Sequence, residues 1–292
     1  MTAWVLGVIG GSGVYDIDGL QDARWTKIDS PFGAPSDELL IGRLGEVGLV
    51  FLPRHGRGHR LPPTFVNARA NIDVLKRAGC TDLISLSAVG SLREELAPGD
   101  FVIVDQFVDR TFARDKSFFG PGFTAHVSMA HPVCPRLSHL AAEVGRAAGA
   151  RIVEGGCYLA MEGPQFSTMA ESALYRSWGC DVIGMTNMPE AKLAREAELP
   201  YASVAMVTDY DCWREAQAHV EMTHIVEVMT GNAHKSRELV RRLALVLPAE
   251  RSPSPIDTCL TGALVTAHSA RDPELVEKLS AIIGRALKSE SQ

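Results

Sequence analysis

The chain has 292 residues, of which 46% are hydrophobic and 22% are charged. This composition is ordinary for a globular protein, and the length suits one large α/β domain or two small ones. The net charge of −6 argues against a nucleic-acid-binding protein, which needs an extended basic face.

The N-terminal residues, the apolar runs and the cysteines indicate the cellular compartment in which we expect the protein. The first residues, MTAWVLGVIGG, contain no basic segment before a long apolar run, so no secretory signal is predicted. No apolar run reaches the roughly 18 residues that indicate a membrane span. The six cysteines form no CxxC pair and no zinc-like spacing with histidine, so we expect reduced thiols and no metal site. A cytoplasmic protein that binds neither membrane nor nucleic acid is the expectation.

Strands and helices alternate along the first half of the chain. Apolar runs predict buried strands at Trp4–Ile9, Leu39–Leu44, Gly48–Leu52 and Asp82–Ser87, the last of them breaking at Ala88–Leu92. Helical spacing predicts a helix over Thr64–Ala78 whose buried face holds Phe65, Ala68, Ile72 and Leu75.

The second half repeats the alternation after a long loop. Strands are predicted at Phe101–Val108, Gly156–Met161, Asp181–Met185 and Tyr201–Thr208. Helices are predicted at Leu137–Ala148, Glu171–Trp178, Glu190–Ala197, Thr223–Val246 and Pro273–Lys288. Residues 110–132 have little periodicity, and loops of that length are usually functional or lie at an interface. The pattern predicts an α/β fold in one domain, residues 1–292, with a central mixed β-sheet flanked by helices and a C-terminal helical cap from about residue 256.

A glycine loop follows the first predicted strand. Glycines in Gly10–Gly13 let backbone N–H groups approach an anion, and Ser12 adds a hydroxyl donor. The dinucleotide-binding pattern GxGxxG fails because Asp16 stands where its last glycine is required. The loop is therefore either a plain tight turn or a phosphate loop.

A basic loop follows the predicted hairpin. The segment from Arg54 to Arg60 (RHGRGHR) combines planar guanidinium groups, which match phosphate oxygens, with glycines that permit close approach. A solvated surface loop is the alternative. Because ligand loops collect where buried strands of α/β folds end, the position favours an anion site.

Two carboxylates close the strand Tyr201–Thr208. Asp209 and Asp211 are two residues apart at the end of this strand, so both can point the same way. A purine leaving group needs a proton at N7, which a carboxylic acid of raised pKa supplies, while a second carboxylate accepts a hydrogen bond from an amine at C6. A helix cap or turn is the competing interpretation. A metal site is a third, but no further ligand lies at suitable spacing.

Other candidates follow strands or start helices, and each has a structural alternative. Phe166 stacks on a base or packs in the core, and Met185 contacts a sugar or packs in the core, while Thr186 beside it is a phosphate donor. The residues Met222, Ile225 and Val226 belong to the packed face of the long helix or line an apolar pocket. His126, in the long loop, is a surface or an interface residue.

Taken together, these motifs resemble the methylthioadenosine phosphorylase family, within the trimeric purine nucleoside phosphorylases. The resemblance extends over residues 7–213 and is carried in family order by GVIGGSGVYD, PFGAPSD, PRHGRGH, VNARANIDVLKRAGC, SAVGSLREELAPGDFVI, MEGPQFSTMAES, DVIGMTNMPEAKLAREA and TDYDCW. Each motif is modest, but the ordered set is specific. It implies a nucleoside-phosphorylase-like fold, a homotrimer, a nucleoside and inorganic phosphate as small-molecule partners, and no cofactor.

The resemblance also implies roles for matched positions. Phosphate would be held by Ser12, Arg54, His55, Ser87, Ala88 and Thr186, with His59 nearby. Met185 would face the ribose, Phe166 would stack on the base, Asp209 would be the catalytic acid at N7, and Asp211 would select the 6-amino group. Specificity would come from Ser167, Met222, Ile225 and Val226, and from His126 of a neighbouring subunit. The chain departs from the family at Gln165, where arginine is frequent, and at Ser87, where threonine is frequent.

The implied reaction is phosphorolysis of S-methyl-5′-thioadenosine. The nearest alternative is a phosphorylase for 6-oxopurine nucleosides or S-methyl-5′-thioinosine, which favours an amide over a carboxylate at the base. The carboxylates Asp209 and Asp211 therefore favour adenine. A non-catalytic nucleoside-binding protein is the alternative from a different class.

Overall fold

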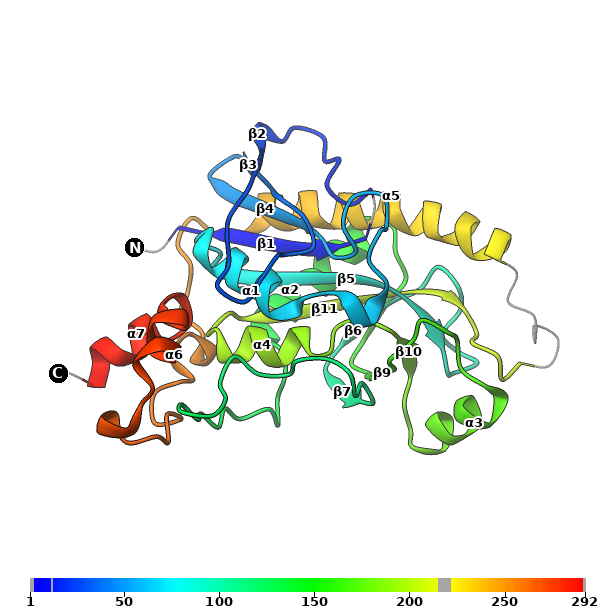
Figure 1. Cartoon of the computed structure of the whole chain (residues 1–292). Helices are drawn as coiled ribbons and strands as arrows, with labels where there is room; N and C mark the ends of the chain where they lie inside the picture. The colour runs from blue at the N-terminus through cyan, green and yellow to red at the C-terminus, as the bar shows by residue number, and fades with distance from the viewer. Residues whose placement is uncertain (1–2, 12, 215–221, 291–292) are drawn as a thin grey trace.

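A single mixed β-sheet organises residues 3–11, 13–214 and 222–290, which are the residues that this computed structural model describes (Figure 1). Its main path runs β2-β3-β4-β1-β5-β10-β9-β7, while β11 pairs with β5 and β6, and β8 pairs with β6. The strands are β1 (Val5–Gly10), β2 (Gln21–Thr26), β3 (Leu39–Leu44), β4 (Val47–Pro53), β5 (Asp82–Ser91), β6 (Phe101–Val104), β7 (Gln106–Asp109), β8 (Ile152–Glu154), β9 (Cys157–Ala160), β10 (Val182–Gly184) and β11 (Tyr201–Asp209).

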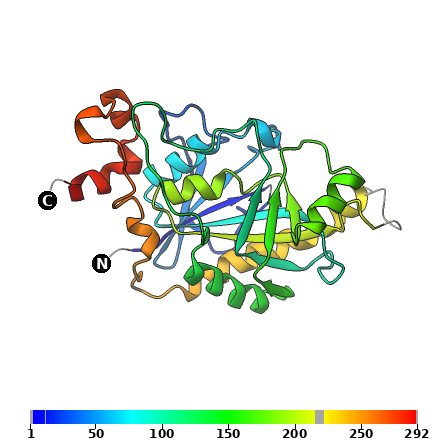
Figure 2. The same cartoon turned by 90° about the horizontal axis from the view of Figure 1, so that it is seen from below.

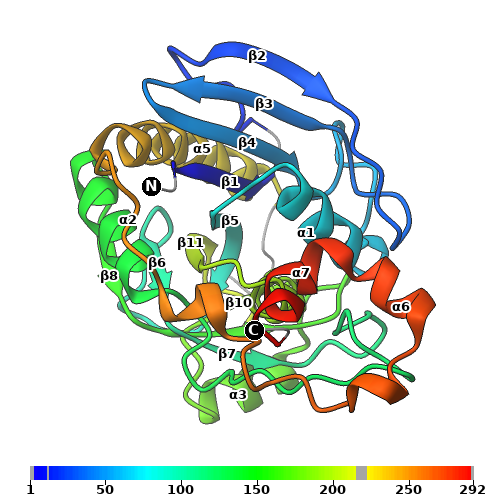
Figure 3. The ribbon, with the colours of Figure 1, turned by 90° about the vertical axis from the view of Figure 1, so that its left-hand side faces the viewer.

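Helices cover both faces of this sheet. They are α1 (Ala68–Arg77), α2 (Pro135–Ala147), α3 (Met169–Ser177), α4 (Glu190–Glu196), α5 (Met222–Val246), α6 (Pro273–Lys278) and α7 (Ser280–Glu290). Figure 3 shows α2 and α5 on one side and α1, α6 and α7 on the other. Two buried apolar clusters match these two faces, one including residues of α1, α4 and α7, the other residues of α2 and α5. In Figures 1 and 2, α3 and the C-terminal helices lie at opposite ends of the molecule.

The central strand β5 changes partner part-way along its length. Residues 82–85 pair with β1 in parallel, whereas Gly90 and Ser91 pair with β10 in the antiparallel sense. On the other side, β11 runs parallel to β5 as far as Gly90. Residues 86–89 therefore face a gap in the sheet between β1 and β10. Ligands of open α/β sheets bind where strand order switches in this way.

Several predicted boundaries are wrong for physical reasons. The strand predicted to break at Ala88 continues to Ser91, because pairing with β10 and β11 holds its small residues in extended conformation. The strand predicted over Phe101–Val108 is two strands that separate at Asp105. The predicted helix Thr64–Ala78 begins only at Ala68, after a short 3-10 turn, because the Asn67 side chain accepts the Ala70 N–H and caps it.

The same shift of boundaries moves side chains to unexpected faces. Phe65, predicted on a buried helical face, lies in the 3-10 turn and is 73% exposed. The predicted final helix Pro273–Lys288 is two helices, α6 and α7, separated at Leu279. The strands β2 and β8 were not predicted. β2 is mostly exposed and lacks an apolar run, and β8 has only three residues.

Candidate active site

A pocket of about 350 Å³ opens at the gap beside β5. It collects residues that follow β1, β4, β10 and β11, together with side chains from α5. Ten of the residues that the sequence singles out line it: Arg54, His55, His59, Ser87, Ala88, Phe166, Met185, Thr186, Asp209 and Asp211. Loops far apart in the sequence thus converge on one cavity.

Arg54 is the first residue after β4 and is almost completely buried, at 3% exposure. Its backbone N–H donates to the Gly10 carbonyl (2.9 Å), which ties the basic loop to the glycine loop. Its Nε donates to Oε2 of Glu190 (2.9 Å), and the two side chains form a buried ion pair. The guanidinium therefore lines the pocket while the carboxylate of Glu190 balances its positive charge.

His55 lies beside Arg54 and is held neutral. Burial, reinforced by the Arg54 charge, lowers its pKa from 6.5 to about 4. Its Nδ1 lies 2.9 Å from the Leu61 carbonyl, and because a carbonyl only accepts, Nδ1 carries the proton. Its ring stacks on that of His59, with centroids 4.4 Å apart and planes 9° apart. Nε2 therefore carries no proton and is left to accept a hydrogen bond, as from a protonated oxygen of a ligand.

Two hydroxyl groups extend this end of the pocket. The Ser87 Oγ is buried and has no hydrogen-bond partner among the described residues. The Thr186 hydroxyl lies 3.2 Å from the Tyr158 hydroxyl and donates to Oδ1 of Asn187 (3.1 Å). A buried, unpaired hydroxyl is costly unless a ligand satisfies it, so Ser87 indicates a polar ligand here.

The carboxylates Asp209 and Asp211 line the pocket through a turn at the end of β11. Oδ1 of Asp209 accepts the backbone N–H of Asp211 (2.8 Å), and Oδ2 accepts the Thr208 hydroxyl (2.7 Å). Asp211 adopts a positive φ of 51°, so the pair is arranged by this turn rather than by strand alternation. Burial raises the pKa of both carboxyl groups above the ordinary value of an aspartate, against the opposing effect of their hydrogen bonds.

Phe166 and Met185 reach the pocket from two neighbouring loops. Phe166 is 60% exposed, so the core alternative for this side chain is wrong. Met185 is accommodated by Gly163, where a Cβ would lie 2.5 Å from the methionine sulfur. An exposed aromatic face at a cavity is suited to stacking on a planar ligand.

An ion pair outside the pocket fixes both loops. Arg114, in the long loop 110–132, donates through Nε to Oε1 of Glu162 (2.9 Å). Its Nη1 donates to the carbonyls of Met185 and Met188, each at 2.8 Å. Glu162 also accepts the N–H of Phe112 (2.6 Å). Through these hydrogen bonds the long loop holds in place the segments that carry Met185 and Phe166.

The pocket has one end lined by Arg54 and hydroxyl groups and another lined by two carboxyl groups, and the described residues place no set of metal ligands beside them. Within the described ranges, no group of three histidine, cysteine, aspartate or glutamate side chains is placed to hold a metal ion. No helix in the same ranges is long and apolar enough to cross a membrane.

The sequence matches the family model of the phosphorylase superfamily over residues 5–244. The chain belongs to the phosphorylase superfamily.

Individual members of the phosphorylase superfamily are similar to this chain over nearly its whole length. The S-methyl-5′-thioadenosine phosphorylase of Cereibacter sphaeroides is 64% identical over 286 residues, which are 97% of this chain and 99% of the relative. That of Bradyrhizobium diazoefficiens is 60% identical and covers 99% of this chain and 100% of the relative.

Solved structures of the superfamily agree with the fold. A methylthioadenosine phosphorylase sourced from an Antarctic soil metagenomic library is 43% identical, with a TM-score of 0.91, and covers 97% of this chain and 99% of its own. A methylthioadenosine phosphorylase from Schistosoma mansoni in complex with adenine is 36% identical, with a TM-score of 0.78, and covers 85% and 93%.

Some predicted residues of this phosphorylase do not line the pocket. Ser167 is buried behind it, where its hydroxyl contacts the Met161 sulfur (3.7 Å). His126 is exposed and lies outside the pocket lining, and its backbone N–H donates to the Ala263 carbonyl (2.9 Å). The calls on Ser12 and on the side chains of Met222, Ile225 and Val226 lie outside the described residues.

Sequence reasoning missed three charged residues of this phosphorylase that support the pocket, Arg114, Glu162 and Glu190. Their partners are distant in sequence, as with Arg54 and Glu190, which are 136 positions apart. The only sequence signal for Glu190 was its position directly after a proline at a predicted helix start. Because that position is also typical of an ordinary helix N-terminus, it did not single out Glu190.

Proposed function

We propose that this chain uses inorganic phosphate to split S-methyl-5′-thioadenosine into adenine and 5-methylthioribose 1-phosphate, a step of purine and methionine salvage. The enzyme is a pentosyl-transferring glycosyltransferase. The observation that carries the proposal is the placement of an anion-binding end, with Arg54 and His55, and a carboxylic-acid end, with Asp209, in one pocket. The relatives named S-methyl-5′-thioadenosine phosphorylase support the choice of nucleoside.

At the anion end, phosphate is held by Arg54, His55, Ser87, Ala88 and Thr186, with His59 stacked on His55; Ser12, the further ligand expected from the sequence, lies outside the described residues. The free hydroxyl of Ser87 supports this assignment, since it lacks a partner among the described residues. Phosphate attacks C1′ as the bond from C1′ to the purine N9 breaks. The anion stabilises the positive charge that develops on the sugar, so no covalent enzyme intermediate is needed.

At the other end, Asp209 gives its proton to N7 as the bonding electrons move into the purine. Burial shifts the pKa of Asp209 upward, which is the direction that a general acid requires. Asp211 accepts a hydrogen bond from the 6-amino group, and Phe166 stacks on the base. Met185 faces the ribose.

We assign the 5′-methylthio group to the part of the pocket next to α5, where the sequence leads us to expect Met222, Ile225 and Val226; their side chains lie outside the described residues. Later residues of the same helix, including Met229, Asn232 and Ala233, line the pocket, which supports this placement. Ser167 shapes the base end from behind. The reaction needs no cofactor beyond phosphate as co-substrate, and the six free cysteines suit a reducing cytoplasm.

The working unit is a homotrimer in which His126 enters the pocket of a neighbouring subunit. The exposure of His126 supports this arrangement, as does the exposure of Phe65 (73%) and Phe112 (81%), which are large apolar side chains. Light scattering on the purified chain tests it, and a fully active monomer would overturn it.

The decisive experiment measures release of adenine from S-methyl-5′-thioadenosine with and without phosphate. Release that depends on phosphate, with formation of a sugar 1-phosphate, is expected. Cleavage without phosphate would indicate a hydrolase, and no cleavage would indicate a binding protein. The same assay with S-methyl-5′-thioinosine and inosine tests the base, since a clear preference for either would favour the 6-oxopurine alternative.

A further inference from the structure

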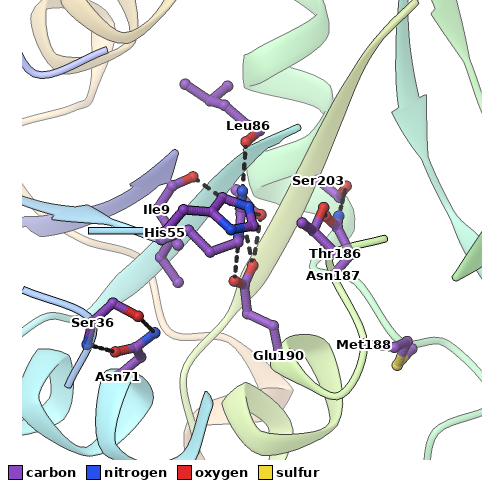
Figure 4. Close-up of polar contacts among 12 residues, drawn as sticks. Ile9, Ser36, His55, Asn71, Leu86, Thr186, Asn187, Met188, Glu190 and Ser203 are labelled. Carbon is purple, nitrogen blue, oxygen red and sulfur yellow. Dashed lines mark hydrogen bonds and ion pairs between the residues drawn. The ribbon is translucent and has the colours of Figure 1, made fainter. Parts of the chain in front are cut away.

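Glu190, the first residue of α4, has a role that the reaction scheme above leaves open. It is 7% exposed, and its carboxylate accepts hydrogen bonds from three side chains on different elements. These are Arg54 after β4, Ser85 in β5 (2.6 Å) and Tyr201 in β11 (2.8 Å). In Figure 4, dashed lines end on the carboxylate of Glu190, which lies below His55 and Leu86 in this view.

The contacts fix the guanidinium of Arg54 in one orientation. Nε and Nη2 meet the two carboxylate oxygens of Glu190, at 2.9 and 3.3 Å. Nη2 also donates to Oγ of Ser85 (2.6 Å), and Nη1 donates to the Leu86 carbonyl (3.0 Å). Arginine has five N–H groups, and among the described residues one N–H of Nη1 has no hydrogen-bond partner. Because Arg54 lines the pocket, that N–H is the group left for a ligand.

We propose that Glu190 is a positioning residue for phosphate: it holds Arg54 from behind, so that the remaining N–H of Arg54 is directed at the phosphate. This inference rests on the proposed function of the pocket. A bidentate carboxylate defines the plane of a guanidinium as well as its location, which a single contact does not do. Without Glu190, a buried arginine would turn toward water or toward the anion itself.

Glu190 is charged in the folded protein, as the role requires. Burial acts to raise its pKa, but the Arg54 guanidinium and its hydrogen bonds outweigh burial and lower it. A carboxylate buried to the same degree elsewhere provides the comparison. Glu198 is 4% exposed and pairs with Arg285 (2.5 Å), yet neither residue lines the pocket.

The test compares Glu190→Gln with Glu198→Gln as matched control. A glutamine keeps one oxygen but presents an amide to Arg54 in place of the second, so two donors face each other. We expect the KM for phosphate to rise about 10-fold or more in Glu190→Gln, the scale of a lost hydrogen bond to a charged group, while the KM for the nucleoside stays within 2-fold. Glu198→Gln should leave both constants unchanged.

Milder variants keep the test decisive if Glu190→Gln fails to fold. Tyr201→Phe removes one support of the carboxylate and leaves the ion pair intact, whereas Ser85→Ala removes both a support of the carboxylate and an acceptor of Arg54 Nη2. Each should raise the KM for phosphate about 3-fold, with no change for the nucleoside. Equal changes in both KM values, or none in any folded variant, would overturn the proposal.

A cycle with Arg54→Gln and direct titration of inorganic phosphate complete the design. If Glu190 acts through Arg54, the double variant binds phosphate no more weakly than Arg54→Gln alone, and additive losses would contradict the inference. Calorimetric titration with phosphate alone needs no turnover. A wild-type chain that binds phosphate without cleaving the nucleoside would refute the proposed function. The phosphate affinities of the variants, measured by the same titration, would still test whether Glu190 positions Arg54.

Discussion

The substitution Asp209→Asn separates the chemistry of Asp209 from its part in the fold. In the wild type, Oδ1 accepts the Asp211 N–H (2.8 Å) and Oδ2 accepts the Thr208 hydroxyl (2.7 Å). An asparagine keeps the first contact through its oxygen. Its amide then donates to Thr208, whose own proton turns to the Val89 carbonyl, 3.1 Å away. No buried polar group loses its partner, so the free energy of unfolding should change by less than about 1 kcal/mol.

The chemical effect of the same substitution should be much larger. An amide has no proton to give to N7, and loss of a general acid typically costs about 10²- to 10⁴-fold in rate. This corresponds to about 3 to 5 kcal/mol of activation free energy. We expect kcat for adenine release to fall by that factor, measured by ultraviolet absorbance at saturating phosphate and nucleoside. Thermal melting of the same preparation provides the control for folding.

Two results would refute this reasoning. A folded Asp209→Asn variant whose kcat stays within about 3-fold of wild type, far short of the expected loss, would mean that the proton at N7 comes from elsewhere. A large loss of stability would mean that Asp209 is chiefly a structural turn residue. In that case the fall in activity would say nothing about acid catalysis.

Four further predictions address other parts of the pocket. Ser87→Ala should raise the KM for phosphate about 10-fold without lowering the melting temperature, since its hydroxyl has no partner among the described residues; an unchanged KM would place phosphate elsewhere. Phe166→Ala should raise the KM for the nucleoside by about 5- to 100-fold through lost stacking, and urea unfolding should stay unchanged because the side chain is 60% exposed. His55 binds its proton more weakly folded (pKa about 4) than unfolded (6.5), so its stabilising contribution is complete above pH 6.5 and is lost toward pH 4. Acidification to pH 4.5 should therefore lower the free energy of unfolding, measured by urea titration, by about 2 kcal/mol less in His55→Asn than in the wild type. Identical pH profiles of stability in the two proteins would contradict the assignment. Gly184→Ala should sharply reduce activity, because a Cβ there would lie 2.0 Å from the Tyr158 hydroxyl; wild-type turnover would show that the loop adjusts freely.

The sequence predicts the strands and their functional ends well where local chemistry decides. The apolar runs that became β1, β4 and β11 end within two residues of their predicted limits, and each is followed by a loop that lines the pocket. Parallel strands place their carboxyl ends together, so Arg54 and Asp209 line one pocket although 155 positions separate them in the sequence.

The sequence fails where partners far along the chain decide. The stretch after Ser87 is locally similar to a loop, yet pairing with β10 and β11 extends it as strand to Ser91. The supports of the pocket are missed for the same reason. Glu190 and Arg114 touch no ligand in the proposed scheme, and their importance follows from contacts with Arg54 and Met185 that no local pattern predicts.

The pocket at the gap beside β5 has a deeply buried part and a more exposed part. The part proposed to hold phosphate is built from the innermost strands and from Arg54, which is 3% exposed and holds a buried ion pair with Glu190. The part proposed to hold the base is built from a surface loop bearing the exposed Phe166 and from the turn after β11. We therefore expect substitutions of Phe166 to cost less stability than substitutions of Arg54, which makes base preference the part of the proposed function that is more open to redesign.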